Sequence, residues 1–435
     1  MTVPPKIATL PTVTSPAAVA THLPLSATLE ADLMTIAGCS VAELVDRFGS
    51  PLQIVDLTDI DTRAHEYVEA LAALDRPARA VFATKAFPII ALVARLGRLG
   101  IGADVTTAGE LALARRAQIV PDRILYHGNA RSEDELREAA ELGVGLVVID
   151  GPQDVDHLDA VATRPVDVLV RITPGVAPAT HESMATAHHG QKFGVTIAEA
   201  PAIFRAIDAS SSLKLRGIHV HVGSQITALE PFVDAITRVG ALGSFEVLDA
   251  GGGLGVPQHP AMAAPATAHY IHALDDAMRT AGFDPATELI VEPGRSLVAR
   301  AVVTVYRVRT VKTSAGRTFV AVDGGTSDDG EAVSGLRTAS PFALTGGVTS
   351  PVTLVGLHCD SGDVLARDVA FGVVAPGSLV VMPGTGAYTF SLANNYNCAT
   401  RPSVVAVEAG EARVLVRRET VDELFSRQVV DPGSD

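Results

Sequence analysis

A repeated alternation of short apolar segments with amphipathic segments constrains the fold of this chain more than any other feature. The apolar segments are QIVDL, RAVFATK, GIGADV, ILYHG, LVVID, DVLVRI, LRGIHVHV, FEVLDAGGG and LIVEPG. The segments between them, such as IIALVARLGRL, AGELALARRA and SEDELREAAELG, have the apolar spacing of helices that bury one face. Strand and helix in alternation predict a parallel α/β fold.

The residues at the carboxyl ends of these predicted strands distinguish a barrel from an open sheet. A barrel gathers all its strand ends into one ring, whereas an open doubly wound sheet gathers only the ends near its switch point. Chemically capable residues follow many different strands: Lys85, Asp104, His127, Arg171, His221, Gly251 and Glu292. We therefore predict an α/β (β/α)8 TIM barrel over residues 53–297, with the open sheet as the competing fold.

The pattern changes after the barrel. From residue 298 to 435, segments such as RTFVAVDGG, VTLVGLHC and EARVLVRRE are short, rich in β-branched residues and separated by glycine, proline or aspartate. This pattern predicts an antiparallel β domain. Residues 1–25, rich in alanine, threonine and proline, are predicted to form a flexible tail. Residues 26–52, with one helix ending at Gly49, are predicted to form a preface that packs on the β domain.

The charge and the cysteine content exclude several functional classes. The net charge is -15, and a nucleic-acid-binding protein would need a basic surface. The cysteines, Cys39, Cys359 and Cys398, are too scattered to predict disulfides or a zinc site. No apolar run approaches the roughly 20 residues that span a bilayer, and we see no signal peptide. We expect a soluble, cytoplasmic protein with no metal, membrane or nucleic-acid partner.

Two features suggest a phosphorylated carbonyl cofactor, although each has an ordinary explanation. Lys85 ends an apolar strand, where its amine could form a Schiff base or simply extend into solvent. The run LDAGGGLGV places Gly251, Gly252 and Gly253 directly after a strand, where backbone N–H groups could bind a phosphate or merely form a turn. The run lacks the spacing of a dinucleotide site and the lysine of a P-loop.

Two further motifs could contact such a cofactor. His219 and His221 alternate on one strand and point the same way. They could bind a metal, but no third ligand lies nearby in the sequence, and an imidazole could equally stack on a flat ring. Glu292 and Arg295 in VEPGRS could form a structural ion pair. Alternatively, the carboxylate could contact a protonated ring nitrogen and the guanidinium a phosphate or carboxylate.

Together these motifs resemble the fold-type III pyridoxal-phosphate-dependent decarboxylases, and among them the diaminopimelate decarboxylases. The similarity runs in order from about residue 45 to 415. Its landmarks are FATKAF (82–87), ADVTTAGEL (103–111), HGNARS (127–132), VRITPGV with THE (170–182), KFGV (192–195), GIHVHVGSQI (217–226), GGGLG (251–255), EPGRS (292–296), VDGG (322–325), HCDSGD (358–363) and GAYTFSLANNYN (386–397). Each alone is weak, and HCDSGD by itself is an ordinary turn sequence. The resemblance implies an alanine racemase-like barrel with a C-terminal β domain.

The resemblance also implies residue roles around pyridoxal 5'-phosphate. The implied catalytic residues are Lys85, Cys359, Glu292 and His221. The implied cofactor-binding residues are Lys85, Asp104, Arg171, His221, Ser224, Gly251, Gly252, Gly253, Glu292, Arg295 and Tyr388. The implied substrate-binding residues are Arg295, Arg337, Asp360 and Tyr388. Cys359 and Asp360 would reach the partner's active site, so a homodimer with composite active sites is expected.

Three departures from the family pattern fall on substrate recognition. The diaminopimelate enzymes carry an Arg-Pro-Ala-Leu-Tyr run after VDGG that grips the distal carboxylate, and here Glu331 stands near the place of that arginine. Asp360 replaces the usual glutamate of the cysteine loop, and residues 181–194 read HESMATAHHGQKFG, where the loop usually carries acidic residues before the Lys-Phe-Gly. Either Arg337 replaces the missing arginine and the substrate is meso-diaminopimelate or a close analogue, or the substrate is a different amino acid or a specialised-pathway intermediate.

Two other classes share this fold. A non-catalytic barrel that binds pyridoxal phosphate generally lacks the β domain and the cysteine loop, and this chain has both. A racemase would use a tyrosine base from the β domain, whereas the Cys-Asp loop of this chain fits a decarboxylase better.

Overall fold

The computed structural model describes residues 22–30, 32–176, 192–259, 261–345, 351–370 and 372–429. Its chain divides into two compact units. Unit 1 comprises Met1–Ile60, Pro257–Ala263 and Val298–Asp435, and unit 2 comprises Asp61–Val256 and Ala264–Leu297. Most of the tail expected at residues 1–25 lies outside the described residues, as does most of the 181–194 segment that carries the third departure.

Unit 2 is the expected barrel. Its strands are β5 (Ala78–Ala83), β6 (Gly102–Val105), β7 (Ile124–Tyr126), β8 (Leu146–Ile149), β9 (Val166–Thr173), β11 (Leu213–Val220), β12 (Val247–Asp249) and β13 (Glu288–Val291). Each pairs in parallel with the next, β13 pairs with β5, and the β8–β9 pairing closes the ring. A short strand β10 (Val195–Thr196) adds to β9. The prediction of a closed barrel rather than an open sheet is confirmed.

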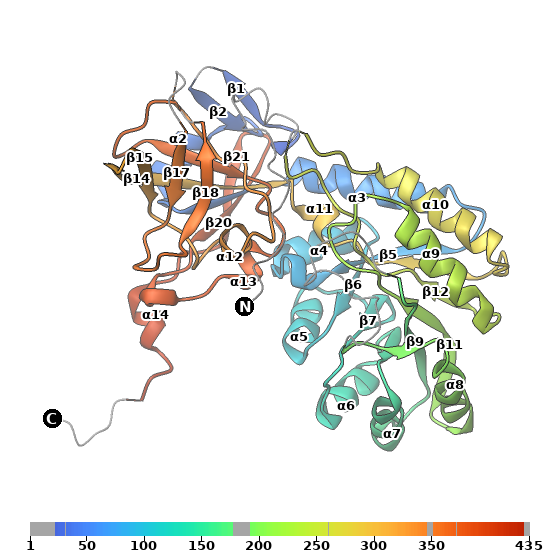
Figure 1. Ribbon diagram of the computed structural model, residues 1–435. Coiled ribbons are helices and arrows are strands. Elements are labelled where there is room, and N and C mark those ends of the chain that lie inside the picture. Colours follow the sequence, from blue (N-terminus) through green and yellow to red (C-terminus); the bar gives the residue numbers. More distant parts are fainter. Residues whose placement is uncertain are drawn as a thin grey trace. The chain divides into compact units, whose positions relative to one another are not determined.

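Helices connect the strands and surround them (Figure 1). They are α3 (Leu57–Ala72), α4 (Ile90–Arg98), α5 (Ala108–Arg116), α6 (Glu133–Leu142), α7 (Pro152–Val161), α8 (Ala200–Ala209), α9 (Glu230–Val239), α10 (Thr267–Thr280) and the short α11 (Arg295–Val298). Their ends follow local sequence signals. In α6, Ser132 and Glu135 form a capping box, and Gly143 ends the helix in the left-handed conformation.

The inside of the barrel is packed with aliphatic side chains from almost every strand. This core consists of Val81, Leu125, Leu146, Val148, Leu169, Val247 and Ile290. A filled interior leaves the carboxyl ends of the strands as the place where polar side chains can gather without burial inside the core.

One strand expected to begin the barrel lies elsewhere. The barrel was expected from residue 53, but β4 (Leu52–Asp56) pairs antiparallel with β14 (Val302–Ser314) and parallel with β20 (Ser403–Glu408) in unit 1. All five residues of β4 are buried, as in a barrel strand. The local pattern is therefore the same for both positions, and only the non-local pairing partner distinguishes them.

Unit 1 is a sheet domain. Its remaining elements are β1 (Thr28–Glu30), β2 (Leu33–Ile36), β3 (Cys39–Ser40), α2 (Val41–Phe48), β15 (Arg317–Val322), α12 (Gly330–Val333), β16 (Phe342–Ala343), β17 (Val352–Val355), β18 (Val364–Val369), β19 (Leu379–Pro383), α13 (Thr389–Leu392), β21 (Glu411–Val416) and α14 (Val421–Phe425). Most pairings are antiparallel, as expected, whereas β4–β20 and β15–β17 are parallel. Side chains of β2 and α2 share one core with β14, β19 and β20.

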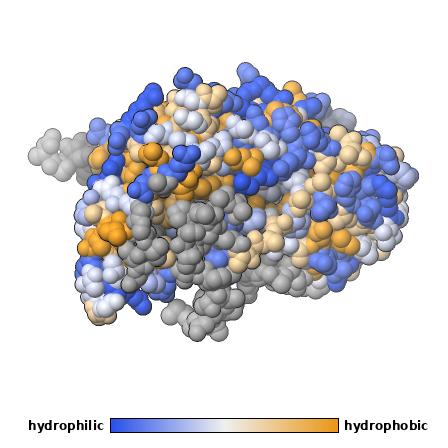
Figure 2. Space-filling model, turned by 90° about the horizontal axis from the view of Figure 1, so that it is seen from above, coloured by the Kyte–Doolittle hydropathy of each residue, from blue (hydrophilic) through white to orange (hydrophobic). Residues whose placement is uncertain are grey.

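The surface mixes polar and apolar residues. On the face drawn in Figure 2, hydrophilic residues in blue and hydrophobic residues in orange are interspersed. Within the described ranges, no helix combines the length and hydropathy needed to cross a bilayer.

Candidate active site

The strand ends of the barrel bring most of the predicted cofactor residues together. Lys85 lies in a short 3-10 turn (Thr84–Ala86) that directly follows β5, and Asp104 lies in the neighbouring β6. Nζ of Lys85 is 3.7 Å from Oδ2 of Asp104. The Lys85 side chain is 50% exposed, while Asp104 is only 2% exposed. The amine is thus held beside a buried carboxylate but remains accessible to a ligand.

The glycine run is required by the close approach of three backbone segments. A Cβ on Gly252 would lie 2.2 Å from the carbonyl oxygen of Glu292, and one on Gly253 would lie 2.2 Å from that of Gly223. Gly251 and Gly253 also have φ of 67° and 106°, in the left-handed region that favours glycine. Any side chain here would push apart the ends of β11, β12 and β13, which carry the site.

The segment after β11 is tied to the glycine run, which places Ser224 beside it. Ile226 N–H donates to the carbonyl of Gly253 at 2.9 Å, and Gly255 N–H donates to the carbonyl of Ile226 at 2.8 Å. The Gln225 side chain exchanges two hydrogen bonds with the backbone of Val256. Half-buried Ser224 therefore sits in a fixed turn next to Gly253.

Two of the glycine amides already have acceptors in the protein. Gly251 N–H donates to Oδ1 of Asp249 at 2.8 Å, and Gly252 N–H donates to Nδ1 of His221 at 3.2 Å. The second bond leaves Nδ1 of His221 without a proton. Burial lowers the pKa of His221 well below its ordinary value, so the ring is neutral at physiological pH. A neutral, fixed imidazole presents a flat face suited to stacking.

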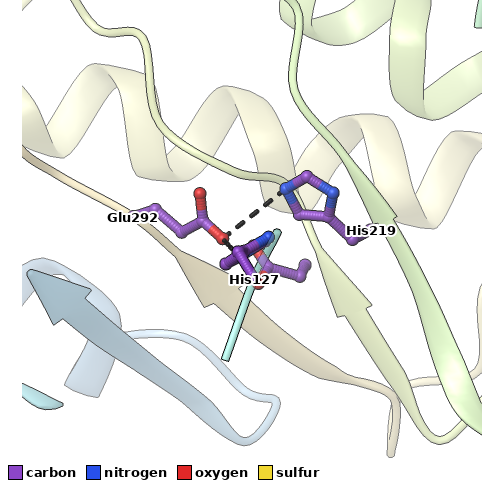
Figure 3. A group of neighbouring side chains, drawn as sticks. His127, His219 and Glu292 are labelled. Atoms are coloured by element: carbon purple, nitrogen blue, oxygen red, sulfur yellow. Dashed lines mark hydrogen bonds and ion pairs between the residues drawn. The ribbon is translucent and has the colours of Figure 1, made fainter. Parts of the chain in front are cut away.

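Glu292, which follows β13, receives contacts from two histidines. Its Oε1 lies 2.5 Å from Nε2 of His127 and 3.5 Å from Nε2 of His219, and Figure 3 shows both rings directed at this carboxylate. Burial alone would raise the pKa of Glu292. The two imidazoles outweigh burial and hold the pKa well below its ordinary range, so the side chain is a carboxylate.

The same group of side chains has the residue types of a metal site but not the distances of one. Ligand atoms of His127, His219, Asp249 and Glu292 all lie within 4.8 Å of one another. Neighbouring ligands of a tetrahedral Zn²⁺ are about 3.3 Å apart, given metal–nitrogen distances near 2.0 Å. His127 and Glu292 are 2.5 Å apart, which is a hydrogen-bond distance. This pair is joined by a hydrogen bond, and the expectation of a site without metal remains a prediction.

Two arginines complete this part of unit 2, Arg171 half-buried and Arg295 buried. Arg171, in β9, packs its guanidinium over the ring of Phe193 at 4.3 Å. Burial lowers the pKa of Arg171, and the charge of Asp150 partly offsets this effect. Arg295 begins α11 and is 5% exposed. The barrel thus holds both arginines that were predicted for the cofactor pocket.

The cysteine loop belongs to unit 1, and its end residues, His358 and Asp363, are buried while the residues between them are exposed. His358 and Asp363 face inward: His358 N–H donates to Oδ2 of Asp363 at 2.8 Å, and the His358 ring contacts Oγ of Ser327 at 2.9 Å. Cys359 and Asp360 are exposed. The buried residues fix the loop, and the two predicted functional residues face the surface.

Arg337 does not have the surroundings of a substrate-binding residue. Its guanidinium pairs with Oδ2 of Asp329, and their side chains are 2% and 0% exposed. It also donates to the carbonyl oxygen of Pro383 at 3.3 Å. Arg337 therefore already has a full-charge partner within unit 1, and nearby Glu331 is buried as well.

Tyr388 stands at the start of α13 in unit 1. It is half-buried, and its φ of 61° is unusual for a residue with a side chain. Strain of this kind is often found where a side chain is held for a function.

Three members of the Glu292 group were not among the predicted site residues. His127 follows β7 and had been noted only as a polar strand end, His219 was considered for metal binding or stacking, and Asp249 was not considered. Asp249 could have been found from its position, since a carboxylate in the apolar run FEVLDA is unusual. Burial and the neighbouring Glu292 raise its pKa well above the ordinary value.

Comparisons with known proteins agree on one family. Residues 57–299 match the family described as pyridoxal-dependent decarboxylase, pyridoxal binding domain. Diaminopimelate decarboxylase of Actinosynnema pretiosum subsp. auranticum is 42% identical, over 93% of this chain and 95% of that protein. The enzyme of the same name from Synechocystis sp. is 34% identical, over 96% of this chain and 94% of that protein.

Solved structures agree with these relatives. The structure of diaminopimelate decarboxylase from M. jannaschii in complex with L-lysine has a TM-score of 0.88 and 26% identity, covering 94% of this chain and 98% of that chain. The Helicobacter pylori enzyme complexed with L-lysine has a TM-score of 0.84 and 27% identity, covering 88% of this chain and 98% of that chain.

Proposed function

Because the chain belongs to the pyridoxal-dependent decarboxylases of the diaminopimelate decarboxylase family, we propose that it decarboxylates meso-diaminopimelate or a close analogue. With meso-diaminopimelate the product is L-lysine. The observation that carries the proposal is the ring of strand ends that places an accessible amine, Lys85, beside buried Asp104 in the same site as the ionised Glu292. An amine that can hold an aldehyde and a carboxylate that can pair with a ring nitrogen are the groups that a pyridine aldehyde cofactor uses.

The residues present fit pyridoxal 5'-phosphate. Lys85 offers the amine that attaches the aldehyde, and neutral His221 offers a flat face for the ring. Glu292, as a carboxylate, can accept a hydrogen bond from a protonated ring nitrogen. The Gly251 and Gly252 amides have acceptors within the protein, so we assign the phosphate chiefly to Ser224 and Gly253, with Arg295 and Tyr388 as expected helpers.

The chemistry follows from this arrangement. When bound, pyridoxal 5'-phosphate supplies an electron sink for the pair released as the bond from Cα to the carboxylate breaks. Lys85 holds the cofactor before the substrate amine replaces it. Glu292 keeps the proton on the ring nitrogen, and buried Asp104 and half-buried Arg171 set the charge of the pocket. Cys359 or Lys85 then returns a proton to Cα.

The β-domain loop supports a composite site in a homodimer. Cys359 and Asp360 are exposed on a loop that is held by a hydrogen bond between the buried residues His358 and Asp363. We assign these two residues to the active site of a second copy of the chain. Mixing inactive Lys85→Ala and Cys359→Ala proteins tests this assignment. If the sites are composite, random exchange of subunits makes about a quarter of all active sites intact. No recovery after proven exchange of subunits contradicts it.

A second candidate differs only in the far end of the substrate. Arg337 is buried in an ion pair with Asp329, so it is not positioned as the replacement for the missing arginine. Glu331 is buried in the same segment. This segment therefore offers no available arginine to a distal carboxylate, which is the best partner for that group. The second candidate is thus a decarboxylase for an amino acid that lacks a distal carboxylate.

One experiment separates these functions. The protein is loaded with pyridoxal 5'-phosphate, and carbon dioxide release is measured from meso-diaminopimelate, lysine, ornithine and arginine. Release from diaminopimelate alone supports the first candidate, and release only from another amino acid supports the second. Cofactor binding without turnover would indicate a non-catalytic barrel, and loss of optical rotation without carbon dioxide would indicate a racemase.

A further inference from the structure

The buried group around Glu292 contains more polar residues than attachment of a cofactor requires. His127 follows β7, His219 lies in β11 and Asp249 in β12, each on a different strand from Glu292. Burying four such groups costs free energy unless they have hydrogen-bond partners. They converge on one point of the barrel, where their side-chain atoms lie within 4.8 Å of one another.

The distances identify His127 as the dominant partner. Its Nε2 lies 2.5 Å from Oε1 of Glu292, while Nε2 of His219 lies 3.5 Å from the same oxygen. The first distance is that of a strong hydrogen bond to an ionised group, and the second is at the limit of one. Both histidine contacts engage Oε1, so Oε2 is the oxygen of Glu292 that neither of these histidines contacts.

His127 also faces the residues at the other end of the site. The same Nε2 is 3.8 Å from Oδ1 of Asp104, whose Oδ2 is 3.7 Å from Nζ of Lys85. A single N–H makes its stronger hydrogen bond to the nearer acceptor, which is Glu292. His127 therefore stands between the carboxylate beside the reactive amine and the carboxylate that we assign to the ring nitrogen.

The surroundings leave His127 little freedom. The His127 side chain is 8% exposed and that of Glu292 is 4% exposed. The ring of His219 meets the ring of His127 edge-on, with centroids 4.7 Å apart and planes at 69°. Burial lowers the pKa of His219 to about 3, so this ring is neutral and supports the pair by packing and by its dipole.

We propose that His127 is a positioning residue: by donating its Nε2–H to Oε1 of Glu292, it keeps this carboxylate ionised and directs Oε2 to the ring nitrogen of pyridoxal 5'-phosphate. The inference rests on the proposed function, since it assigns a partner to the cofactor ring. An ionised partner holds the proton on that nitrogen, and the protonated ring withdraws electrons more strongly.

The test compares two substitutions of His127 with one at an exposed histidine. His127→Phe keeps a flat ring and removes the donor, whereas His127→Gln keeps an N–H donor at similar reach. His65→Phe on α3 is the control, because His65 is exposed. The full-length proteins are loaded with pyridoxal 5'-phosphate labelled with 15N at the ring nitrogen, whose chemical shift reports directly on its protonation.

The expected result is a protonated ring nitrogen in the parent protein, in His127→Gln and in His65→Phe, and a shift toward the unprotonated value in His127→Phe. In parallel, kcat of His127→Phe should fall ~10–100-fold with little change in KM, the effect of losing one charged hydrogen bond. His127→Gln should recover most of kcat. An unchanged nitrogen shift in folded His127→Phe would overturn the proposal, whichever amino acid proves to be the substrate.

The cofactor-free protein provides an arm that does not depend on the proposed function. The Nε2–H proton of His127 should give a strongly downfield, slowly exchanging resonance that disappears in both His127→Phe and Glu292→Gln. If the parent protein lacks this resonance, the hydrogen bond and the proposal are wrong. If the resonance is present but the protein does not bind pyridoxal 5'-phosphate, the proposed function fails while the pairing of His127 with Glu292 stands.

Discussion

Each unit contains a buried group of charged residues, and the two groups are completed in different ways. In unit 2, Asp104 is 2% exposed but its partner Lys85 is 50% exposed, with 3.7 Å between amine and carboxylate. In unit 1, Arg337 and Asp329 are 2% and 0% exposed and are bonded directly to each other. The first group keeps a charged end accessible, whereas the second is closed on itself.

This difference separates residues that serve a ligand from residues that serve the fold. A closed buried pair contributes no net charge to a ligand, and breaking it leaves one charge without compensation. An accessible amine beside a buried carboxylate costs little to remove but is available for chemistry. Substitutions in the first group should therefore change turnover, and substitutions in the second should change stability.

The largest expected effect belongs to Lys85. In Lys85→Ala we expect carbon dioxide release to fall by about 10⁴-fold or more, because the variant has lost the amine that holds the cofactor. The absorbance band of the covalently held cofactor should also disappear. Urea unfolding should change by less than about 0.5 kcal/mol, since half of this side chain is already in water.

Turnover in Lys85→Ala near that of the parent protein would remove Lys85 from the mechanism. A large loss of stability would instead place Lys85 with the closed group and would contradict the distinction between the two units.

Arg337→Met should show the opposite behaviour. Removing the guanidinium leaves Asp329 buried without its partner, so the free energy of unfolding should fall by about 3–5 kcal/mol. The double variant Arg337→Met with Asp329→Leu should regain much of this loss, because no unpaired charge remains. Arg413→Met, at an exposed position of β21, is the matched control. Urea denaturation measures all three.

The kinetics of the same variant show whether Arg337 contacts the substrate. Protein that remains folded should keep KM within about threefold, since an arginine closed on Asp329 makes no substrate contact. A 100-fold rise in KM for diaminopimelate with unchanged stability would restore Arg337 as a substrate residue.

The contrast also explains what the sequence could predict. Lys85, Asp104 and Glu292 end barrel strands, and their positions follow from a periodic pattern and collinear motifs. Arg337 lies in a segment that departs from the family pattern, so no motif in the sequence indicated what its side chain contacts. Its pairing with Asp329, eight positions earlier in the chain, depends on tertiary packing that no local pattern encodes.

The barrel boundary failed for the same reason. The residues of β4 form a strand in either unit, and only its pairing with β14 and β20 decides which. His127 could have been read as a strand-end residue, but its partner Glu292 is 165 positions away. Sequence periodicity thus predicts elements and their ends more reliably than contacts between distant segments.

A smaller effect is expected from the pH dependence of Asp328, the buried neighbour of Asp329 in unit 1. Asp328 accepts hydrogen bonds from the Tyr306 hydroxyl at 2.7 Å and from Gly325 N–H at 2.8 Å. Burial raises the pKa of Asp328 to about 7. The folded state therefore binds this proton more tightly than the unfolded state, so the contribution is stabilising at low pH and is lost as the pH rises toward 7.

Asp328→Asn should remove this dependence. Between pH 5 and 8, the parent protein should lose roughly 2–3 kcal/mol of unfolding free energy relative to Asp328→Asn. Urea denaturation of both proteins at several pH values measures the difference. Parallel pH profiles would contradict this prediction. They would show that Asp328 is ionised across this range although it lies beside Asp329.

The smallest effect on stability belongs to Asp360, which tests whether exposure alone identifies a ligand-facing residue. Its carboxylate accepts hydrogen bonds from the Tyr396 hydroxyl at 3.3 Å and from Gly362 N–H at 2.8 Å, at the surface of unit 1. Asp360→Ala should change unfolding by less than about 0.5 kcal/mol. If Asp360 serves the site of a partner subunit, KM for the amino acid should rise about 10-fold, the effect of one lost charged hydrogen bond. Asp360→Glu should retain most of the affinity.

If KM is unchanged in Asp360→Ala, Asp360 only stabilises the turn of the cysteine loop. Exposure of a charged side chain would then indicate a site only where the side chain also has a buried partner, as Lys85 has in Asp104.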